Sequence, residues 1–169
     1  QSLGGVFTAN IWQLALGSST PSSSYTAYSA SGSTAHSAAY FSGVDQTTPS
    51  DTPQTNSGTS DGVSATTVVS ITATGLTSGD LVEFGLAVGI LSGPTFVSVV
   101  ADNSDTTLVR DDPGTQSGES TAATAMLRGV ATGSSLTLSA TITVSGLFGT
   151  IHWFVWALPL NAAAGGFEV

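Results

Sequence analysis

The chain has 169 residues, a formal net charge of −9 and no Cys, and 8% of its residues are charged, against roughly 25% in globular proteins. Its only cations, Arg110 and Arg128, are too few to neutralise phosphates, which excludes nucleic acids and anionic membrane surfaces as partners. The lack of Cys excludes disulfides and thiolate metal sites, and the sequence has no run of 18 apolar residues that would indicate a membrane span.

Small hydroxyl residues dominate the composition, with 26 Ser and 25 Thr, while 40% of the residues are hydrophobic. That apolar content is enough for a core and argues against disorder. The first residue is Gln1 and not Met, which is typical of a mature end left by signal-peptide removal. We therefore expect a protein that is secreted, extracellular or at the cell surface.

The first predicted strand, 6–16 (VFTANIWQLAL), is apolar on both faces. Such a strand needs cover on two sides, either as a central strand of its own domain or as a strand donated to a neighbouring molecule. The Ser- and Pro-rich stretch 17–24 indicates a hinge. We therefore predict that residues 1–24 are a candidate donor segment and that residues 25–169 are a sandwich domain. The polymerisation interface expected on this segment is Val6, Phe7, Ile11, Trp12, Leu14 and Leu16.

Turn-forming residues separate the elements that follow. Less regular strands are expected at 25–30 and 35–44. The stretch 49–62 shows no alternation and is expected to be a linker or long loop, with an internal boundary there. A second long turn, DDPGTQSGES, is expected at 111–120.

Period-two alternation predicts half-buried strands. It is clearest over 63–73, 81–90 and 136–144; in 81–90 the even positions are apolar, opposite Glu83 and small residues. The last strand, 151–160 (IHWFVWALPL), is apolar on both faces and is expected to be central or doubly covered. Shorter strands are expected at 95–101, 106–110 and 121–130.

No ten-residue window carries a helical stripe, and Ser, Thr and Gly are poor helix formers. The chain is therefore predicted to be all-β, a two-sheet antiparallel β-sandwich or jelly roll of about ten strands, with a candidate donated strand at the N-terminus.

An internal repeat appears when the chain is offset by 116 residues. TANIWQLALGSS (8–19) then lies over TAMLRGVATGSS (124–135) with six identities, His36 falls on His152, and Tyr40 falls on Trp156. Residues 6–48 are therefore a candidate second copy of the unit at 122–164. The two units either share one sandwich around a pseudo-twofold axis, or one of them completes the sheet of a neighbouring subunit.

The stretch AAYFSGVDQTTPSDT (38–52), with FSGVDQTTP as its specific part, resembles a pattern in secreted bacterial and phage-associated β-sandwich surface modules. NIWQLALGSS (10–19) and SATTVVSITATGLTSGDLV (64–82) resemble the strands that flank it there. The resemblance implies a concanavalin-like or jelly-roll sandwich on a surface or fibre protein, and no catalytic residue carries over. This chain departs from the pattern by beginning with what would be late strands of such a module.

Metal sites have weak support. His36 and His152 would meet across the pseudo-twofold, but no carboxylate stands at a useful spacing, so structural histidines are favoured over a zinc or copper site. Two acidic loops offer oxygen ligands for Ca²⁺ without the EF-hand spacing, and solvated turns are the simpler interpretation. The residues of that calcium alternative are Asp102, Asp105, Asp111, Asp112 and Glu119.

Catalytic and sugar-binding patterns are equally weak. No G-x-S-x-G elbow occurs, and among the carboxylates only Glu83 adjoins an aromatic residue in a strand. A sugar-stacking platform would need the Trp side chains on one face, but Trp153 and Trp156 are three apart in one strand and so point to opposite faces. Core packing is the favoured role for them. We expect no enzyme activity, no cofactor and no resident metal.

The function expected from the sequence is a structural subunit of an extracellular filament, pilus-like or a matrix fibre, that polymerises head to tail by β-strand complementation and serves in adhesion. Its partner would be a second copy of itself, with glycans or cell surfaces as further partners. The alternatives are a virion or phage fibre or decoration module, and a carbohydrate-binding module.

Overall fold

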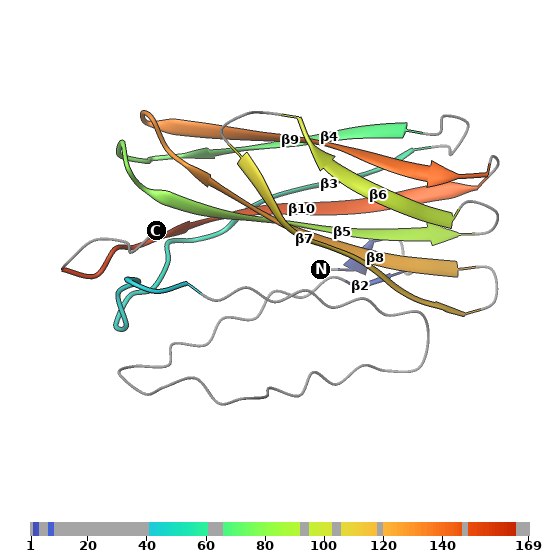
Figure 1. The fold of residues 1–169 in the computed structure, drawn as a ribbon, viewed down its shortest axis with the longest axis horizontal. Coiled ribbons are helices and arrows are strands. Elements are labelled where there is room, and N and C mark those ends of the chain that lie inside the picture. The colour runs from blue at the N-terminus through green and yellow to red at the C-terminus, as the bar shows by residue number, and fades with distance from the viewer. Residues whose placement is uncertain are drawn as a thin grey trace.

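The computed structural model of the chain describes residues Ser2–Leu3, Phe7–Thr8, 41–60, 66–91, 95–102, 106–117, 120–146 and 149–164. These residues form strands and no helix, in two antiparallel main sheets, which confirms the all-β prediction (Figure 1). The strands are β1 (Ser2–Leu3), β2 (Phe7–Thr8), β3 (Gln54–Ser60), β4 (Thr66–Thr74), β5 (Leu81–Leu91), β6 (Thr95–Ala101), β7 (Thr106–Ser117), β8 (Ser120–Val130), β9 (Ser135–Ser145) and β10 (Thr150–Leu160).

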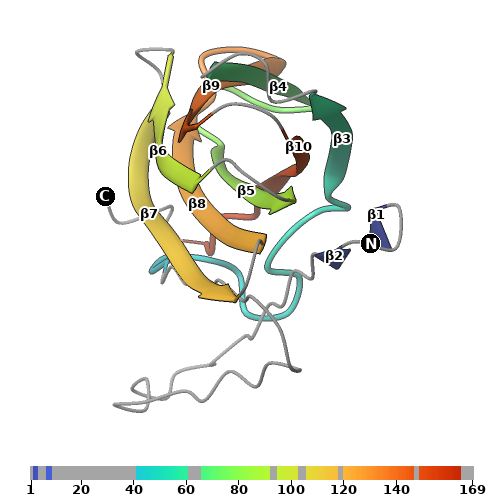
Figure 2. The same ribbon diagram turned by 90° about the vertical axis from the view of Figure 1, so that its right-hand side faces the viewer.

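The larger sheet has five strands in the order β3-β10-β5-β8-β7, and the smaller has three in the order β4-β9-β6. A view along the strands shows the smaller sheet lying over the larger one (Figure 2). β3 contacts β4 on one side, and β7 contacts β6 on the other. The strands β1 and β2 pair with each other in a separate two-stranded sheet.

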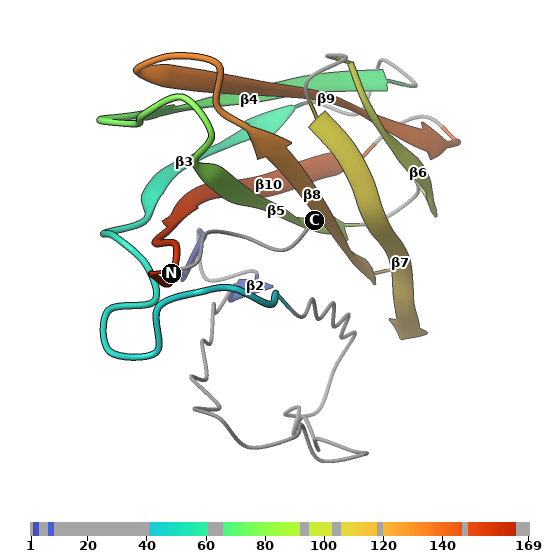
Figure 3. The same ribbon diagram turned by 60° about the vertical axis from the view of Figure 1, so that its left-hand side comes forward.

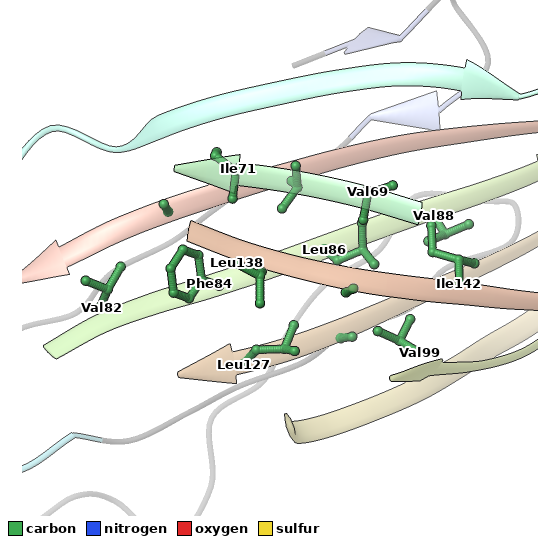
Figure 4. Packing of buried hydrophobic residues seen from close by; sticks show 14 of the residues in the cluster. Val69, Ile71, Val82, Phe84, Leu86, Val88, Val99, Leu127, Leu138 and Ile142 are labelled. Carbon is green, nitrogen blue, oxygen red and sulfur yellow. The ribbon is translucent and has the colours of Figure 1, made fainter. Parts of the chain in front are cut away.

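The main core lies between the two sheets and is built by the alternating positions that the sequence predicts. Along β9 every second side chain is buried, and the inward positions of β4 are Val69, Ile71 and Ala73. The even positions of β5, among them Phe84 and Leu86, point into the same space (Figure 4). Residues with period-two hydrophobicity thus place one face of each strand in the core.

β10 is a central strand, as its two apolar faces predict. It pairs with β3 on one edge and with β5 on the other. Its odd positions, such as Val155, join the core between the sheets, and its even positions, such as Phe154 and Leu158, belong to a second cluster on the opposite side of the sheet.

The prediction of a linker or long loop over 49–62 is wrong for residues 54–60, which form β3. Its sequence, QTNSGTS, has no apolar alternation because β3 is an edge strand whose side chains are mostly exposed or half-buried. The ladder with β10 fixes it in place, from Ser60 opposite Ile151 to Gln54 opposite Ala157.

The turn predicted at 111–120 is also wrong in its first part, since β7 continues to Ser117. The register shifts between Leu108 and Arg110 and between Pro113 and Gln116. A Pro lacks the N–H that a central strand needs, but β7 is the last strand of its sheet, and edge strands and bulges tolerate Pro.

Most of residues 6–48 fall outside the described residues, and so do the strand predicted at 25–30, residues 35–40 of the strand predicted at 35–44, and most of the first copy of the repeat; residues 41–43 are described and form no strand. Residues 41–53 are described, and they run below the larger sheet towards β3 (Figure 3). Val44 forms an isolated antiparallel bridge with Ala162, and Ser50 forms one with Leu160.

Candidate interaction surfaces

The face of the larger sheet that points away from the smaller sheet carries a second apolar cluster. The rings of Phe154 and Trp156 are stacked there, with centroids 6.0 Å apart and an interplanar angle of 28°. Both faces of the middle of this sheet are therefore buried. The sequence predicts β5 as a half-buried strand, with only one of its faces in a core. The cluster comprises Val44, Ala87, Phe154, Trp156, Leu158 and Leu160, with Phe41 and Leu81 packed against it.

Each tryptophan of β10 lies across a glycine of the neighbouring strand. Trp156 is opposite Gly85 of β5, and a Cβ atom at Gly85 would overlap the indole ring. On the other face Trp153 is opposite Gly58 of β3, where a Cβ would stand 2.5 Å from Cζ2 of the indole. The two rings occupy opposite faces as predicted, so they do not form one sugar-stacking platform.

Trp156 is 8% exposed, and its Nε1 has no hydrogen-bond partner among the described residues. A buried donor without a partner costs free energy. The ring is therefore held by its apolar contacts and not by a polar anchor.

Glu83 lies on the same outer face of β5, with Arg128 of β8 and Leu158 of β10 as its register partners. Desolvation by burial raises the pKa of the Glu83 carboxyl to about 7. Arg128 is exposed. The carboxyl is thus partly protonated near neutral pH, and it is the most perturbed acid among the described residues.

A short antiparallel joint connects residues 43–51 with the end of β10 and the residues after it. The Asp45 N–H donates to the Asn161 carbonyl at 2.9 Å, and the Asn161 N–H donates to the Pro49 carbonyl at 3.0 Å. Asn161 Nδ2 also donates to the Thr48 carbonyl at 2.8 Å. These bonds and two more, from Ala163 to Gly43 and from Asp51 to Pro159, clamp both sides of Asn161.

The loop of this joint is ordered by Asp45. The N–H groups of Thr48 and Thr47 donate to Asp45 Oδ1 at 2.9 and 2.7 Å. These backbone hydrogen bonds favour the ionised form and lower the pKa of Asp45 below its ordinary value.

The outer face of the smaller sheet is lined by hydroxyl groups. Thr72 and Thr137 are hydrogen-bonded to each other across β4 and β9 at 2.8 Å. Val68 and Val100, 65% and 55% exposed, stand on either side of Thr141 in one cross-strand row. This face combines hydroxyl groups with isolated apolar side chains.

The edge of β4 is covered by amide side chains from β3. Asn56 Nδ2 donates to the Ser70 carbonyl at 3.1 Å. The amide of Gln54, in the orientation that satisfies both of its groups, donates to the Thr72 carbonyl at 2.7 Å and accepts from the Thr74 N–H at 3.1 Å. Ladder positions that would otherwise be open to another strand are thus occupied, and this protection uses no charge.

The expected polymerisation residues Val6, Ile11, Trp12, Leu14 and Leu16 lie outside the described residues. Phe7 is described for its backbone alone and pairs with Leu3. Of the histidines, His36 is outside, and His152 lies in β10 opposite Gly89.

The calcium alternative is only partly described. Asp102 accepts hydrogen bonds from Thr141 Oγ1 at 2.9 Å and from Ser139 Oγ at 3.3 Å. Asp111 and Asp112 belong to β7, while Asp105 and Glu119 lie outside the described residues. Within the described part of the chain, no three His, Cys, Asp or Glu residues come together as a metal site.

Sequence reasoning missed the joint at Asn161 and the amides of β3, because both depend on which strands become neighbours. One signal was available for the aromatic cluster: Gly85 and Ala87 are small residues on β5, and the chain has large aromatics in 151–160. Small residues in a strand mark places where a neighbouring side chain approaches closely.

Comparisons with protein-family models, with curated proteins and with solved structures found no match for this chain. In the described residues there is no helix of the length and apolarity needed to cross a membrane.

Proposed function

We propose that this chain is a non-enzymatic structural subunit of an extracellular filament assembled by β-strand complementation. The observation that carries the proposal is the position of Phe7 and Thr8, which lie in the doubly apolar stretch 6–16. They pair with Ser2 and Leu3 in a sheet separate from both main sheets. An apolar segment that begins outside the main sheets is suited to complementing a sheet elsewhere.

The proposed architecture is a β-sandwich with jelly-roll connectivity. Strands in the N-terminal region bring the total number of strands to about ten. From β3 to β6 the chain alternates between the larger and the smaller sheet, and it does so again from β8 to β10. β7, next to β8 and in contact with β6, lies at the corner where the sheets approach. Alternation of this kind is the pattern of double-sheet jelly rolls.

The surface chemistry supports a structural role. The outer face of the smaller sheet bears hydroxyl groups, and Glu83, whose pKa burial raises to about 7, has no second carboxyl or histidine as a register partner. Paired groups with separated pKa values are what acid–base catalysis requires. We also propose that such a filament contacts glycans or cell surfaces.

Negative-stain microscopy of the purified full chain tests the function, with long fibres as the expected result. A chain lacking residues 1–16 is expected to give no fibres, because the donated segment is gone. Fibres of the same kind from the shortened chain would refute strand donation, and monodisperse particles from the full chain would refute the filament.

A virion or phage fibre or decoration module is the second candidate, and the alternation of strands between two sheets favours it, since viral capsid domains share that pattern. Discrete particles in the same micrographs would select it. A carbohydrate-binding module has less support, because Trp156 is buried and Trp153 is half-buried against the core on the other face.

A further inference from the structure

β3 and β4 meet at one corner of the sandwich, each as an edge strand of its own sheet (Figure 2). The hydrogen bonds that join them use side chains, and no ladder connects the described residues of the two strands. Ser60 Oγ and Thr67 Oγ1 are hydrogen-bonded at 2.9 Å, and the amides of Asn56 and Gln54 reach the edge of β4. We call this contact the β3–β4 seam.

The edge of β4 in this seam offers backbone groups that a further strand can use. The Gln54 amide donates to the Thr72 carbonyl and accepts from the Thr74 N–H. One residue of a parallel strand would use the same two groups through its own N–H and carbonyl. The Asn56 amide takes the Ser70 carbonyl, the next on that edge. Side-chain amides therefore occupy positions that belong to a ladder.

The core beside the seam is incompletely covered, because the side of β3 that faces the smaller sheet carries no apolar side chain. The β3 residues on that side, which stand opposite inward positions of β10, are Gln54, Asn56, Gly58 and Ser60. Trp153, whose indole lies against Gly58, is only half-buried. The inward side chains of Ile151, Val155 and Ala157 on the same strand are 0% exposed. An apolar strand in the seam would complete the cover of Trp153.

The seam is also free of charge. Neither QTNSGTS of β3 nor TTVVSITAT of β4 contains a charged residue, although the chain has a net charge of −9. Soluble proteins commonly protect strand edges with charged side chains. The stretch 6–16, the donated strand of the proposed function, has no charged residue either. Its length is enough to pair along all 9 residues of β4, and pairing there desolvates no charge.

We propose that the β3–β4 seam is the acceptor site of the filament, and that the stretch 6–16 of a second copy binds there as an added strand. Its backbone replaces the amides of Gln54 and Asn56 on the edge of β4, and its apolar side chains cover Trp153. This inference rests on the proposed function and deepens it by naming the sheet edge that accepts the donated strand. Until that strand binds, the amides protect the edge.

A disulfide across the seam tests the proposal, because a strand cannot enter where β3 and β4 are joined covalently. Ser60→Cys with Thr67→Cys replaces two oxygen atoms that are 2.9 Å apart, so the Cβ atoms lie near the separation that a disulfide needs. The matched control is Thr72→Cys with Thr137→Cys, whose oxygen atoms are 2.8 Å apart across β4 and β9. The chain has no Cys of its own, so each variant has one possible intramolecular disulfide.

Both full-length variants are compared by negative-stain microscopy in the oxidised and the reduced state. The seam variant is expected to give no fibres when oxidised and to regain them on reduction, and the control is expected to give fibres in both states. Fibres from the oxidised seam variant would overturn the proposal. Loss of fibres in the oxidised control would do so as well, because that disulfide leaves the seam open.

A fluorescently labelled peptide with the sequence of residues 6–16 gives a second readout, at protein concentrations below those that give fibres. Fluorescence anisotropy is expected to show binding to the reduced seam variant and loss of binding after oxidation. Equal binding to both states, or none to the reduced state, would overturn the proposal.

The two readouts separate the acceptor site from the filament. Fibres that the seam disulfide leaves unchanged would keep the filament and remove this acceptor site. Peptide binding that oxidation abolishes, without fibres from the unmutated chain, would keep the acceptor site and remove the homopolymer.

Discussion

The contact between Gly85 and Trp156 gives the sharpest stability prediction. A Gly85→Ala variant adds one methyl group where the Trp156 indole already lies. The ring is 8% exposed and stacked on Phe154, so it cannot rotate away without losing contacts. Overpacking of this kind typically costs about 1–3 kcal/mol, although Ala is the better strand residue by itself.

For a domain of this size, about 2 kcal/mol corresponds to a fall of about 4–8 °C in the melting temperature. The measurement is urea unfolding followed by tryptophan fluorescence, with thermal unfolding by circular dichroism. Gly133→Ala is the matched control, since no atom lies within 4 Å of its Cβ position, and it is expected to stay within about 0.5 kcal/mol of the parent.

A double-mutant cycle separates the clash from backbone effects. Trp156→Ala alone is expected to cost about 3–5 kcal/mol, as large-to-small changes of buried aromatics do. In that background Gly85→Ala is expected to be neutral or to stabilise by up to about 1 kcal/mol. An equal cost of Gly85→Ala in both backgrounds would refute the reasoning, because the penalty would then be independent of the ring.

Three further predictions concern polar groups. The folded-state pKa of Glu83 is about 7 and its ordinary value is 4.5, so the folded chain binds the proton more tightly. The contribution of Glu83 to the free energy of unfolding is therefore greatest below pH 4.5, and it falls by about 3 kcal/mol as the pH rises to 7. Glu83→Gln should remove this fall when urea unfolding is measured at pH 5 and at pH 8. A variant with the same pH profile as the parent would show that Glu83 is not the cause of the fall. Asn56→Ala uncovers the Ser70 carbonyl on the edge of β4 and should cost about 1 kcal/mol while raising association in light scattering; an equally monodisperse variant would show that the amide does not guard the edge. Asp102→Ala removes the acceptor of Thr141 Oγ1 and should cost about 1 kcal/mol in urea unfolding; an unchanged free energy of unfolding would show that this hydrogen bond contributes nothing to stability.

The strands that could be predicted are those whose own side chains reveal their environment. In β9 and β4, alternating Leu, Ile and Val against Thr and Ser fixed both the strand and its inward face. β10 was predicted as doubly covered because it is apolar at consecutive positions. For these strands the pattern along one segment is enough, since one face of each lies in the core.

β3 and the second half of β7 could not be predicted, because they form strands only by hydrogen bonding to neighbouring strands and have no hydrophobic pattern of their own. QTNSGTS has no hydrophobic period, but β10 leaves an edge that needs a partner, and Gly58 makes room for Trp153. β7 passes through Pro113 because only one of its edges pairs. Residue propensity is local, whereas the demand for a ladder partner comes from another part of the chain.

The same distinction explains why the apolar outer face of the larger sheet escaped prediction. Glu83, Gly85 and Ala87 look like the solvated side of an amphipathic strand when β5 is considered alone. The structure pairs them with Leu158, Trp156 and Phe154 of β10, so the small residues of one strand accommodate the large residues of the next and the carboxyl between them is desolvated. Small size on β5 therefore reflects close approach and not exposure, which is why the raised pKa of Glu83 and the clash expected in Gly85→Ala have one common cause.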